Sequence, residues 1–229
     1  MQLHNKYDKK TLKKRLFEEP FKRVTLSFYR YVILPIPADY EFETANAFRD
    51  ELYRKFSEMN VFGRVYVANE GINAQVSVPD FNFEKFRMLL DCYTEFNGVP
   101  FKIAVEDDGK SFYKLIVRIK RKIVADGLND GSFDVTNVGT HLTAKQWNEA
   151  MEKPDSVIVD MRNHYESEVG HFKGSILPDA DTFKQELPMV LDALKDKKDK
   201  KILLYCTGGI RCEKARDRKS TRLNSSHRT

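Results

Sequence analysis

Cys206 is the residue of this 229-residue chain whose surroundings point most directly to chemistry. It opens a short run made up of Cys206, Thr207, Gly208, Gly209, Ile210 and Arg211. Glycines permit unusual backbone angles, so successive amides of this run can point inward as an anion-binding nest. A helix expected to start near Arg211 adds its positive end, and the guanidinium adds a fixed charge; both lower a cysteine pKa. The run therefore predicts a nucleophilic, catalytic cysteine.

The other two cysteines are weaker candidates. An isolated free cysteine is more often a small buried hydrophobe than a nucleophile, and only the setting of Cys206 reverses this expectation. Cys212 is either a resolving thiol that attacks a persulfide or sulfenic acid on Cys206, or a plain residue of the first helical turn, and we prefer the plain role. Cys92 lies beside the packing face of a predicted helix, and we treat it as structural.

The elements that must position Cys206 belong to an α/β pattern in the second half of the chain. The expected elements are a helix around 147–151, a strand at 157–160, a helix near 184–194 and a strand at 201–205. Both strands are continuous apolar runs, which is typical of strands buried on both faces of a sheet. Cys206 then follows the carboxyl end of a strand, where ligands bind in open α/β sheets.

The first half of the chain has a different periodicity, which predicts the order β-α-β-β-α-β of a ferredoxin-like split unit. The expected elements are a strand at 29–36, a helix at 43–59, a hairpin at 64–78 turning at Gly71, a helix at 80–93 capped by Asp80, and strand-like runs at 101–105 and 115–124. One of the last two runs is the fourth strand and the other is an additional strand or a connection. Periodicity alone leaves open which is which.

A basic stripe accompanies the last of these runs. Strand alternation places Leu115, Val117 and Ile119 on one face, and the opposite face carries Lys114, Arg118, Lys120 and Lys122. Such a face either follows a phosphate backbone or keeps an exposed sheet edge soluble, and both interpretations stay open. The sequence contains no glycine- and aromatic-rich run of the kind that stacks bases, so we expect recognition of RNA shape or backbone.

Composition sets the broad class. Charged residues make up 32% of the chain, the net charge is +5, and no run of about 18 apolar residues exists, so we expect a soluble protein with no membrane partner. The three cysteines show no metal-ligand spacing, which predicts a reducing cytoplasm and no metal. The oligomeric state stays open. The expected organisation is a basic arm at 1–22, a ferredoxin-like domain at 23–125, a linker at 126–140, a second domain at 141–215 and a tail at 216–229.

The basic arm at 1–22 admits two interpretations. Its lysines and arginines suit an anionic partner, or they form a solvated and partly disordered segment, which is the plainer interpretation.

Several motifs of the second half resemble the rhodanese-like domain. They are Asp160-Met161-Arg162, then Glu166, then Gly170-His171-Phe172-Lys173-Gly174-Ser175, and the run from Cys206 to Arg211. In that family the loop cysteine carries a persulfide during sulfur transfer, and Cys206 occupies the matching position. In the related phosphatases the loop is longer, with five residues between the cysteine and the arginine. Here Arg211 follows Cys206 after four, which disfavours a phosphatase.

Taken with the run from Val67 to Pro79, the segment 206–215 makes the chain similar to the rhodanese-domain tRNA uridine hydroxylase family over about residues 20–215. The resemblance implies an α+β acylphosphatase-like (ferredoxin-like) domain followed by an α/β rhodanese-like domain. It further implies oxygen-dependent formation of 5-hydroxyuridine at the wobble position of tRNA, with Cys206 as the catalytic residue and molecular oxygen as co-substrate. No other cofactor is implied.

The resemblance also suggests roles for other residues. Asp160, Arg162 and His171 match the opening motif, and we assign them to the scaffold of the site, because a carboxylate beside an arginine at a strand end is more often an ion-paired brace. A role facing the substrate RNA is implied for three residues of the hairpin: Asn69, Glu70 and Asn73.

The tail departs from the family pattern. Residues 216–229 contain Leu223 as their only large apolar residue, so we expect a non-native or disordered tail and an incomplete, truncated rhodanese-like domain. Two alternatives to the hydroxylase stay open. One is a persulfide-forming sulfurtransferase, which the Cys206 loop alone would support. The other is a non-catalytic RNA-binding protein, in which the basic surface matters more than the cysteine.

Overall fold

A computed structural model describes residues 7–34, 42–127, 134, 140–197, 199–216 and 225–228. The chain divides into two compact units, Met1–Ile123 and Val124–Thr229. The division falls close to the predicted boundary at residue 125. Most of the predicted linker, at 128–133 and 135–139, lies outside the described residues, so its extent stays a prediction.

The first unit starts with α1 (Lys9–Glu18), whose N-terminal amides donate hydrogen bonds to the Asp8 side chain. Leu16 on this helix is buried, so the described part of the expected basic arm includes a helix with a buried side chain. The remaining elements follow in order: β1 (Arg23–Tyr31), α2 (Phe42–Glu58), β2 (Phe62–Ala68), β3 (Gly71–Pro79), the 3-10 turn η1 (Asp80–Asn82), α3 (Phe83–Asp91), β4 (Lys102–Ile103) and β5 (Leu115–Ile119).

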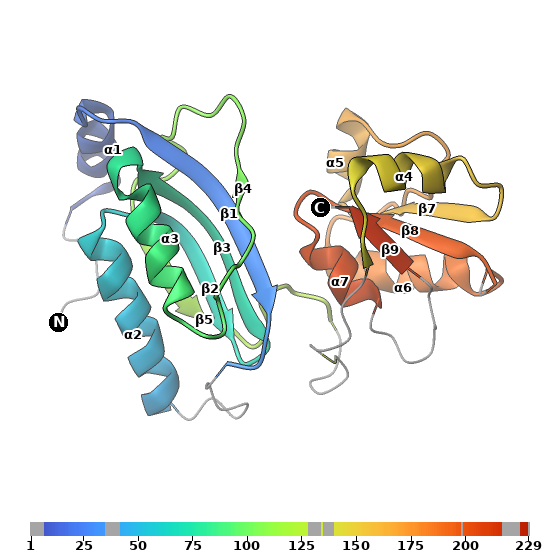
Figure 1. Ribbon diagram of the computed structural model, residues 1–229, viewed down its shortest axis with the longest axis horizontal. Coiled ribbons are helices and arrows are strands. Elements are labelled where there is room, and N and C mark those ends of the chain that lie inside the picture. The colour runs from blue at the N-terminus through green and yellow to red at the C-terminus, as the bar shows by residue number, and fades with distance from the viewer. Residues whose placement is uncertain are drawn as a thin grey trace. The chain divides into compact units, whose positions relative to one another are not determined.

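These strands form one sheet in the order β4-β1-β3-β2-β5, with α2 and α3 on one face (Figure 1). The first four strands are antiparallel neighbours, and this is the ferredoxin-like arrangement that the sequence predicts. β4 is therefore the fourth strand of the motif, and β5 is the additional one, paired parallel to β2 at the opposite edge. The core under the helices is apolar and includes Phe28, Leu52, Phe56, Val65 and Phe86.

The first strand was predicted in the wrong place. It runs over Arg23–Tyr31 and shares only residues 29–31 with the predicted 29–36, of which 35–36 lie outside the described residues. The apolar run at 31–34 drew the prediction too far along the chain, although the alternation of Val24, Leu26 and Phe28 with Thr25 and Ser27 is itself a strand signal. The hairpin is confirmed, and Gly71 has φ 140°. A Cβ on Gly71 would meet the carbonyl oxygen of Arg30, so the close approach of β1 requires glycine there.

The second unit is a parallel α/β layer structure. Its elements are β6 (Thr140–His141), α4 (Ala144–Met151), β7 (Ser156–Asp160), α5 (His164–Val169), α6 (Phe183–Leu194), β8 (Lys201–Tyr205), α7 (Ile210–Arg216) and β9 (Ser225–Arg228). The strand order is β6-β9-β8-β7, with α4 and α5 on one face and α6 and α7 on the other (Figure 1). One hydrophobic cluster lies under α6 and α7, and a second surrounds Trp147 of α4.

β9 corrects one expectation about the tail. Residues 216–229 were expected to be non-native or disordered, but Ser225–Arg228 within them pairs in parallel with β8 and with β6. Residues 217–224 and 229 lie outside the described residues. Strand pairing joins backbone amides and carbonyls, so it does not require the apolar side chains that the tail lacks. That residues 216–229 are non-native stays a prediction.

Candidate active site

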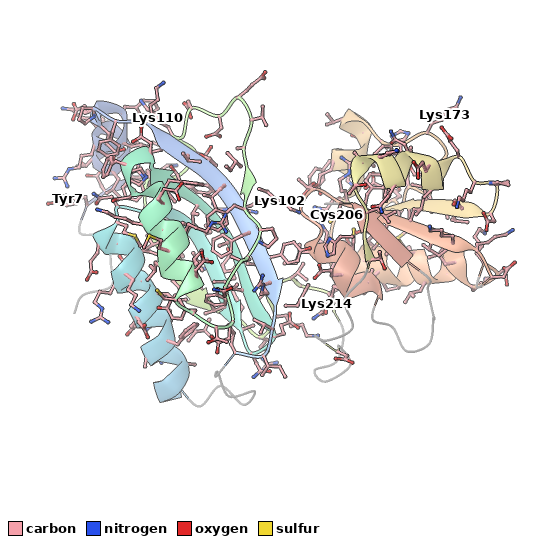
Figure 2. The ribbon with its side chains drawn as sticks, viewed as in Figure 1. Tyr7, Lys102, Lys110, Lys173, Cys206 and Lys214 are labelled. Atoms are coloured by element: carbon pink, nitrogen blue, oxygen red, sulfur yellow. The ribbon has the colours of Figure 1, made fainter. Side chains whose placement is uncertain are left out.

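Cys206 lies directly after the buried strand β8, where the chain enters the loop that leads to α7 (Figure 2). β8 pairs in parallel with β7 along its whole length, from Ser156 opposite Lys201 to Asp160 opposite Tyr205. The carboxyl ends of both strands therefore meet at the same edge of the sheet. Cys206 and the residues that follow Asp160 come together at this edge, as expected for an open α/β sheet.

The loop turns its backbone toward the sulfur. The amide of Gly209 donates a hydrogen bond to the Cys206 Sγ at 2.9 Å, and Gly209 has φ 83°, in the left-handed region. Backbone amides of Gly208 and Cys212 also stabilise the ionised sulfur. Gly208 has no positive φ, and a Cβ there would meet no atom within 4 Å. Of the two loop glycines, Gly209 is thus the one whose backbone conformation favours glycine.

Cys206 is held as a thiolate. Burial raises the pKa of the Cys206 thiol, but a hydrogen bond from the Cys212 thiol, the charge of Arg211 and the loop amides outweigh burial and lower this pKa to about 5. The residue is half-buried rather than sealed. A partly exposed thiolate at neutral pH is the form that attacks electrophiles.

Arg211 is held by a carboxylate that was not among the predicted site residues. Its guanidinium donates to both oxygens of Glu166, at 2.9 and 3.0 Å, and the Thr207 hydroxyl donates to Glu166 Oε1 at 2.7 Å. Burial raises the pKa of Glu166, but the hydrogen bonds from Arg211 and Thr207 lower it below its usual range. Glu166 therefore fixes the arginine and the loop. Its place three residues after Asn163, a capping position at the start of α5, was a signal in the sequence.

Cys212 lies next to Cys206 and is fully buried, in the apolar cluster under α6 and α7. Burial, its hydrogen bond to Cys206 and the negative charge of that sulfur raise the pKa of Cys212 well above its usual value. The pair is therefore one thiolate and one thiol, joined by a hydrogen bond. Two sulfurs within hydrogen-bonding reach can react with each other, so the structure gives the resolving role more support than the sequence did. Cys92, expected to be structural, is exposed beyond the end of α3.

Glu186 is a second carboxylate that the sequence did not reveal. It lies in the first turn of α6 and is fully buried, and neither carboxylate oxygen has a hydrogen-bond partner among the described residues. Burial raises its pKa to about 9, with Arg211 opposing and the charges of Asp160 and Cys206 adding to the rise. Glu186 is thus a neutral acid close enough to Cys206 to feel its charge.

Asp160 forms the brace that the sequence suggests. Arg162 donates from Nε and Nη2 to its two oxygens at 2.8 and 2.7 Å, and the Tyr205 hydroxyl donates to Oδ2 at 2.7 Å. Arg162 also donates to the carbonyl of Gly170 at 2.6 Å. His171 lies further along, with its Nδ1 2.9 Å from the Ser167 carbonyl, which requires a proton on that nitrogen. These contacts fit the scaffold role predicted for the three residues.

The hairpin residues belong to the first unit and hold neighbouring segments. Asn69 donates to the carbonyl of Leu34, Glu70 Oε1 accepts the amide of Ile123 at 2.9 Å, and Asn73 donates to the carbonyl of Ile123 at 3.1 Å. They therefore shape the ends of the sheet. A role facing the substrate RNA stays a prediction.

The predicted basic stripe is only partly a strand face. Leu115 and Val117 are buried and Arg118 is exposed, as the alternation predicts. However, β5 ends at Ile119, so Lys114, Lys120 and Lys122 lie outside the strand. The predicted alternation was extended too far, because β5 is followed by three consecutive charged residues, Lys120, Arg121 and Lys122.

The described residues contain no group of three or more histidine, cysteine, aspartate or glutamate side chains placed to hold a metal ion. Within the same residues, no helix is long and apolar enough to cross a membrane.

Two family models match the chain, one for each unit. Residues 23–123 match the UPF0176 acylphosphatase like domain, and residues 143–226 match the rhodanese-like domain. The chain is 57% identical over 213 residues to the tRNA uridine(34) hydroxylase of Leptospira interrogans, covering 93% of this chain and 56% of that protein. It is 50% identical over 214 residues to the protein of the same name from Yersinia enterocolitica, and 48% identical to that from Photorhabdus laumondii.

The chain spans 56% to 59% of the length of these curated relatives. Both predicted domain types are confirmed, and they occur in the predicted order. With an acylphosphatase-like unit, a rhodanese-like unit that carries Cys206, and identity to these relatives along 93% of its length, the chain belongs to the tRNA uridine(34) hydroxylase family.

Proposed function

We propose that this chain carries out oxygen-dependent hydroxylation of uridine 34 in tRNA, giving 5-hydroxyuridine, with Cys206 as the catalytic residue. The observation that supports this most is the Cys206 thiolate at the carboxyl end of β8, whose Sγ accepts a hydrogen bond from the Gly209 amide at 2.9 Å and whose pKa of about 5 keeps it ionised at neutral pH. The family membership supplies the substrate and the reaction, because the relatives are named for tRNA uridine(34) hydroxylation. The thiols of the site require a reducing compartment such as the cytoplasm.

The electron balance of this reaction suggests a role for Cys212. Inserting one oxygen atom of O2 into the C5–H bond of uridine leaves a second oxygen atom, which needs two electrons and two protons to become water. The Cys206 thiolate and the Cys212 thiol supply the two electrons and one proton when they join in a disulfide, and the second proton comes from water. Uridine, O2, the Cys206 thiolate, the Cys212 thiol and one proton then give 5-hydroxyuridine, water and one disulfide. The hydrogen bond between the two sulfurs supports this pairing.

The test is a single-turnover experiment on undermodified tRNA, with nucleosides measured by mass spectrometry. Without added thiol, product should stop near one 5-hydroxyuridine per chain, and the protein should become about 2 Da lighter as two thiol hydrogens are lost. Added dithiothreitol should restore turnover, and removal of oxygen should abolish it. Cys206→Ser should give no product. Cys212→Ser should lose the single 5-hydroxyuridine per chain that the unchanged protein forms without added thiol.

Cys92→Ser is the matched control, because Cys92 lies in the other unit and is exposed. It should behave as the unchanged protein. Hydroxyuridine formed at the normal rate by Cys206→Ser would overturn the proposed function. Full activity without added thiol in Cys212→Ser would leave the hydroxylase in place and reject only the dithiol. Salt-dependent tRNA binding without product from any preparation would instead favour a non-catalytic RNA-binding protein.

A sulfurtransferase is the second candidate, supported by the match of residues 143–226 to the rhodanese-like domain and by the loop amides around Cys206. The Cys206 thiolate would attack the outer sulfur of thiosulfate, forming a persulfide as sulfite leaves. Cyanide would then take the outer sulfur as thiocyanate and return the thiolate. Persulfide formation gives a mass increase of about 32 Da, one sulfur atom, which Cys206→Ser should abolish. A protein that shows neither this adduct nor thiocyanate is not a sulfurtransferase.

A further inference from the structure

The sheet of the first unit has two very different faces. One face lies under α2 and α3 and is apolar, with Leu26, Ile72, Val76 and Val67 fully or almost fully buried. The intervening strand positions point to the other face, because side chains alternate along a strand. On the four longest strands these positions are mostly polar, aromatic or basic.

The strand register places tyrosines and a cation in one row across this second face. Tyr29 on β1 is opposite Asn73 on β3, and Asn73 is opposite Tyr66 on β2. Tyr66 is in turn the partner of Arg118 on β5. Both tyrosines are half-buried, whereas Arg118 is exposed. The four side chains therefore lie side by side on four adjacent strands.

A second row runs parallel to the first and adds further polar groups. Lys102 on β4 is opposite Ser27 on β1, Ser27 is opposite Gln75, and Gln75 is opposite Arg64 on β2. Gln75 and Arg64 are exposed. Figure 2 shows Lys102 on the strand at this edge of the sheet.

Cations approach the rings of both tyrosines. The Nζ of Lys102 lies 5.5 Å from the centroid of the Tyr29 ring, and the Nζ of Lys120 lies 5.6 Å from the centroid of the Tyr66 ring. Among the described strand positions of this face, none carries an acidic side chain. The face is therefore positively charged, with aromatic rings between the charges.

Among the described residues, loops form hydrogen bonds to this face at its two ends. At one end Thr25 and Ser77 hydrogen-bond to Asp107 and Gly109 of the loop between β4 and β5. At the other end Asn73 bonds to Ile123. Exposed Gln75, Arg64 and Arg118 lie between these ends.

We propose that the surface formed by Tyr29, Tyr66, Asn73, Gln75, Arg64, Arg118, Lys102 and Lys120, the tyrosine face, binds unpaired nucleotides of RNA. Bases stack on the Tyr29 and Tyr66 rings, and the cations contact phosphates. Stacking on aromatic side chains beside a cationic backbone track is how proteins hold single strands. The proposal rests on the proposed function only for the identity of the RNA, which would then be the unpaired loop that contains uridine 34.

The spacing of the rings favours unpaired nucleotides over a duplex. Tyr29 and Tyr66 are two strands apart, about 9.5 Å at the usual strand spacing of about 4.8 Å. Successive bases in a regular stack are only about 3.4 Å apart. Two neighbouring bases reach both rings only when they are splayed apart, and only single strands and loops allow this.

The test measures binding of a fluorescent single-stranded oligoribonucleotide by anisotropy, on the full chain. Tyr29→Ala and Tyr66→Ala should each weaken binding about 5- to 150-fold, which is the range for one stacked base. Tyr29→Phe and Tyr66→Phe keep the ring and should bind nearly as well as the unchanged protein. Amide hydrogen exchange of the first unit verifies that the alanine variants remain folded.

The cations are tested by salt dependence. Arg118→Ala should reduce the slope of log affinity against log salt by about 0.7, the value for one phosphate contact to a single strand. Lys85→Ala is the matched control, because Lys85 is an exposed cation on α3, on the opposite side of the sheet. It should leave the slope unchanged.

The proposal is overturned if both alanine variants bind the single strand as tightly as the unchanged protein. It is also overturned if a duplex of the same sequence binds as tightly as the single strand and is weakened by the alanine substitutions to the same extent. Neither result depends on catalysis. A chain that hydroxylates tRNA while the alanine variants bind normally rejects the tyrosine face and retains the proposed function. A chain that binds single strands through the tyrosines but never hydroxylates tRNA retains the tyrosine face and rejects the proposed function.

Discussion

In the first unit the core is one apolar cluster, and its single buried charged residue among those described, Arg23, lies at the edge in an ion pair with Glu19. The second unit buries five ionisable residues in the described part of the chain: Asp126, Asp160, Glu186, Glu213 and Lys214. Glu213 and Lys214 lie on α7, which follows the Cys206 loop, and Asp160 ends the neighbouring strand. Among the described residues, buried ionisable groups are thus concentrated in the unit that carries the cysteine.

This difference shows where each unit places its polar groups. An antiparallel sheet covered on one side exposes its polar groups on the open face, where they are solvated. A parallel sheet covered on both sides presents them at its strand ends, where neighbouring charges act through a partly desolvated environment and shift pKa values. The first arrangement suits binding of an extended polyanion, and the second suits a reactive thiolate.

The largest expected effect concerns the ion pair between Lys214 and Asp126, whose side chains are both fully buried and 3.2 Å apart. Lys214→Met leaves the Asp126 carboxylate buried without its cation. We expect the second unit to lose about 3–5 kcal/mol of unfolding free energy, as for other broken buried pairs. Amide hydrogen exchange should report the loss in residues 140–216 and leave the first unit unchanged.

A double variant separates lost charge pairing from lost packing. Asp126→Asn with Lys214→Met removes both charges, so most of the stability should return. If the double variant is as unstable as Lys214→Met alone, the unpaired buried carboxylate is not the cause of the lost stability. The buried ionisable groups of the second unit would then not distinguish its stability from that of the first unit.

In the first unit the comparable weak point is a backbone position rather than a charge. Gly71 has φ 140°, and its Cα faces the carbonyl of Arg30 on β1. Gly71→Ala should therefore separate β1 from β3 and cost about 2–4 kcal/mol, through strain and steric overlap. Urea unfolding followed by hydrogen exchange in residues 23–79 would measure this loss. An alanine variant of full stability would show that the strands can part at no cost.

Features coded within one short segment were predictable from the sequence. The Cys206 loop, its place after an apolar strand and the hairpin at Gly71 depend on adjacent residues, and all three are found in the structure. The ion pair between Asp160 and Arg162 is equally local. Such features need only backbone geometry and neighbouring chemistry.

Features that depend on contacts across the fold were not predictable. Glu186 has the polar character of an exposed helix residue, and only the packing of α6 against the sheet buries it. The tyrosines of the first sheet lie on different strands, so no single run of sequence places Tyr29 near Tyr66. The pairing of β9 is a backbone property of four residues that are polar in sequence.

Glu186 provides a pH-dependent test of the buried ionisable groups. Its folded pKa of about 9 exceeds its usual value of 4.5, so the unfolded chain ionises between these values while the folded chain does not. Stability is therefore lost as pH rises through this window, by up to about 1.4 kcal/mol per pH unit. Glu186→Gln removes this titration. Its unfolding free energy should fall less between pH 6 and pH 8 than that of the unchanged protein.

Equal pH slopes for the two proteins would mean that Glu186 is ionised in the folded state, paired with a group that the described residues do not show. The alkylation rate of Cys206 with iodoacetamide gives a second measurement. A neutral Glu186 repels the thiolate little, so Glu186→Gln should leave the pH dependence of alkylation centred near pH 5. A downward shift would show that a carboxylate charge had been removed.

The smallest expected effects distinguish the two loop glycines and complete the comparison with Gly71. Gly208 has an ordinary φ and open space at its Cβ, so Gly208→Ala should change stability by less than about 0.5 kcal/mol. Gly209 has φ 83°, so Gly209→Ala should cost about 1 kcal/mol and displace the amide that bonds to Sγ. Because that amide stabilises the thiolate, the alkylation pKa of Cys206 should rise in Gly209→Ala and stay unchanged in Gly208→Ala. If Gly208→Ala raised it as much, the nest would depend on both glycines, and loop strain rather than one oriented amide would explain how the second unit keeps its sulfur ionised.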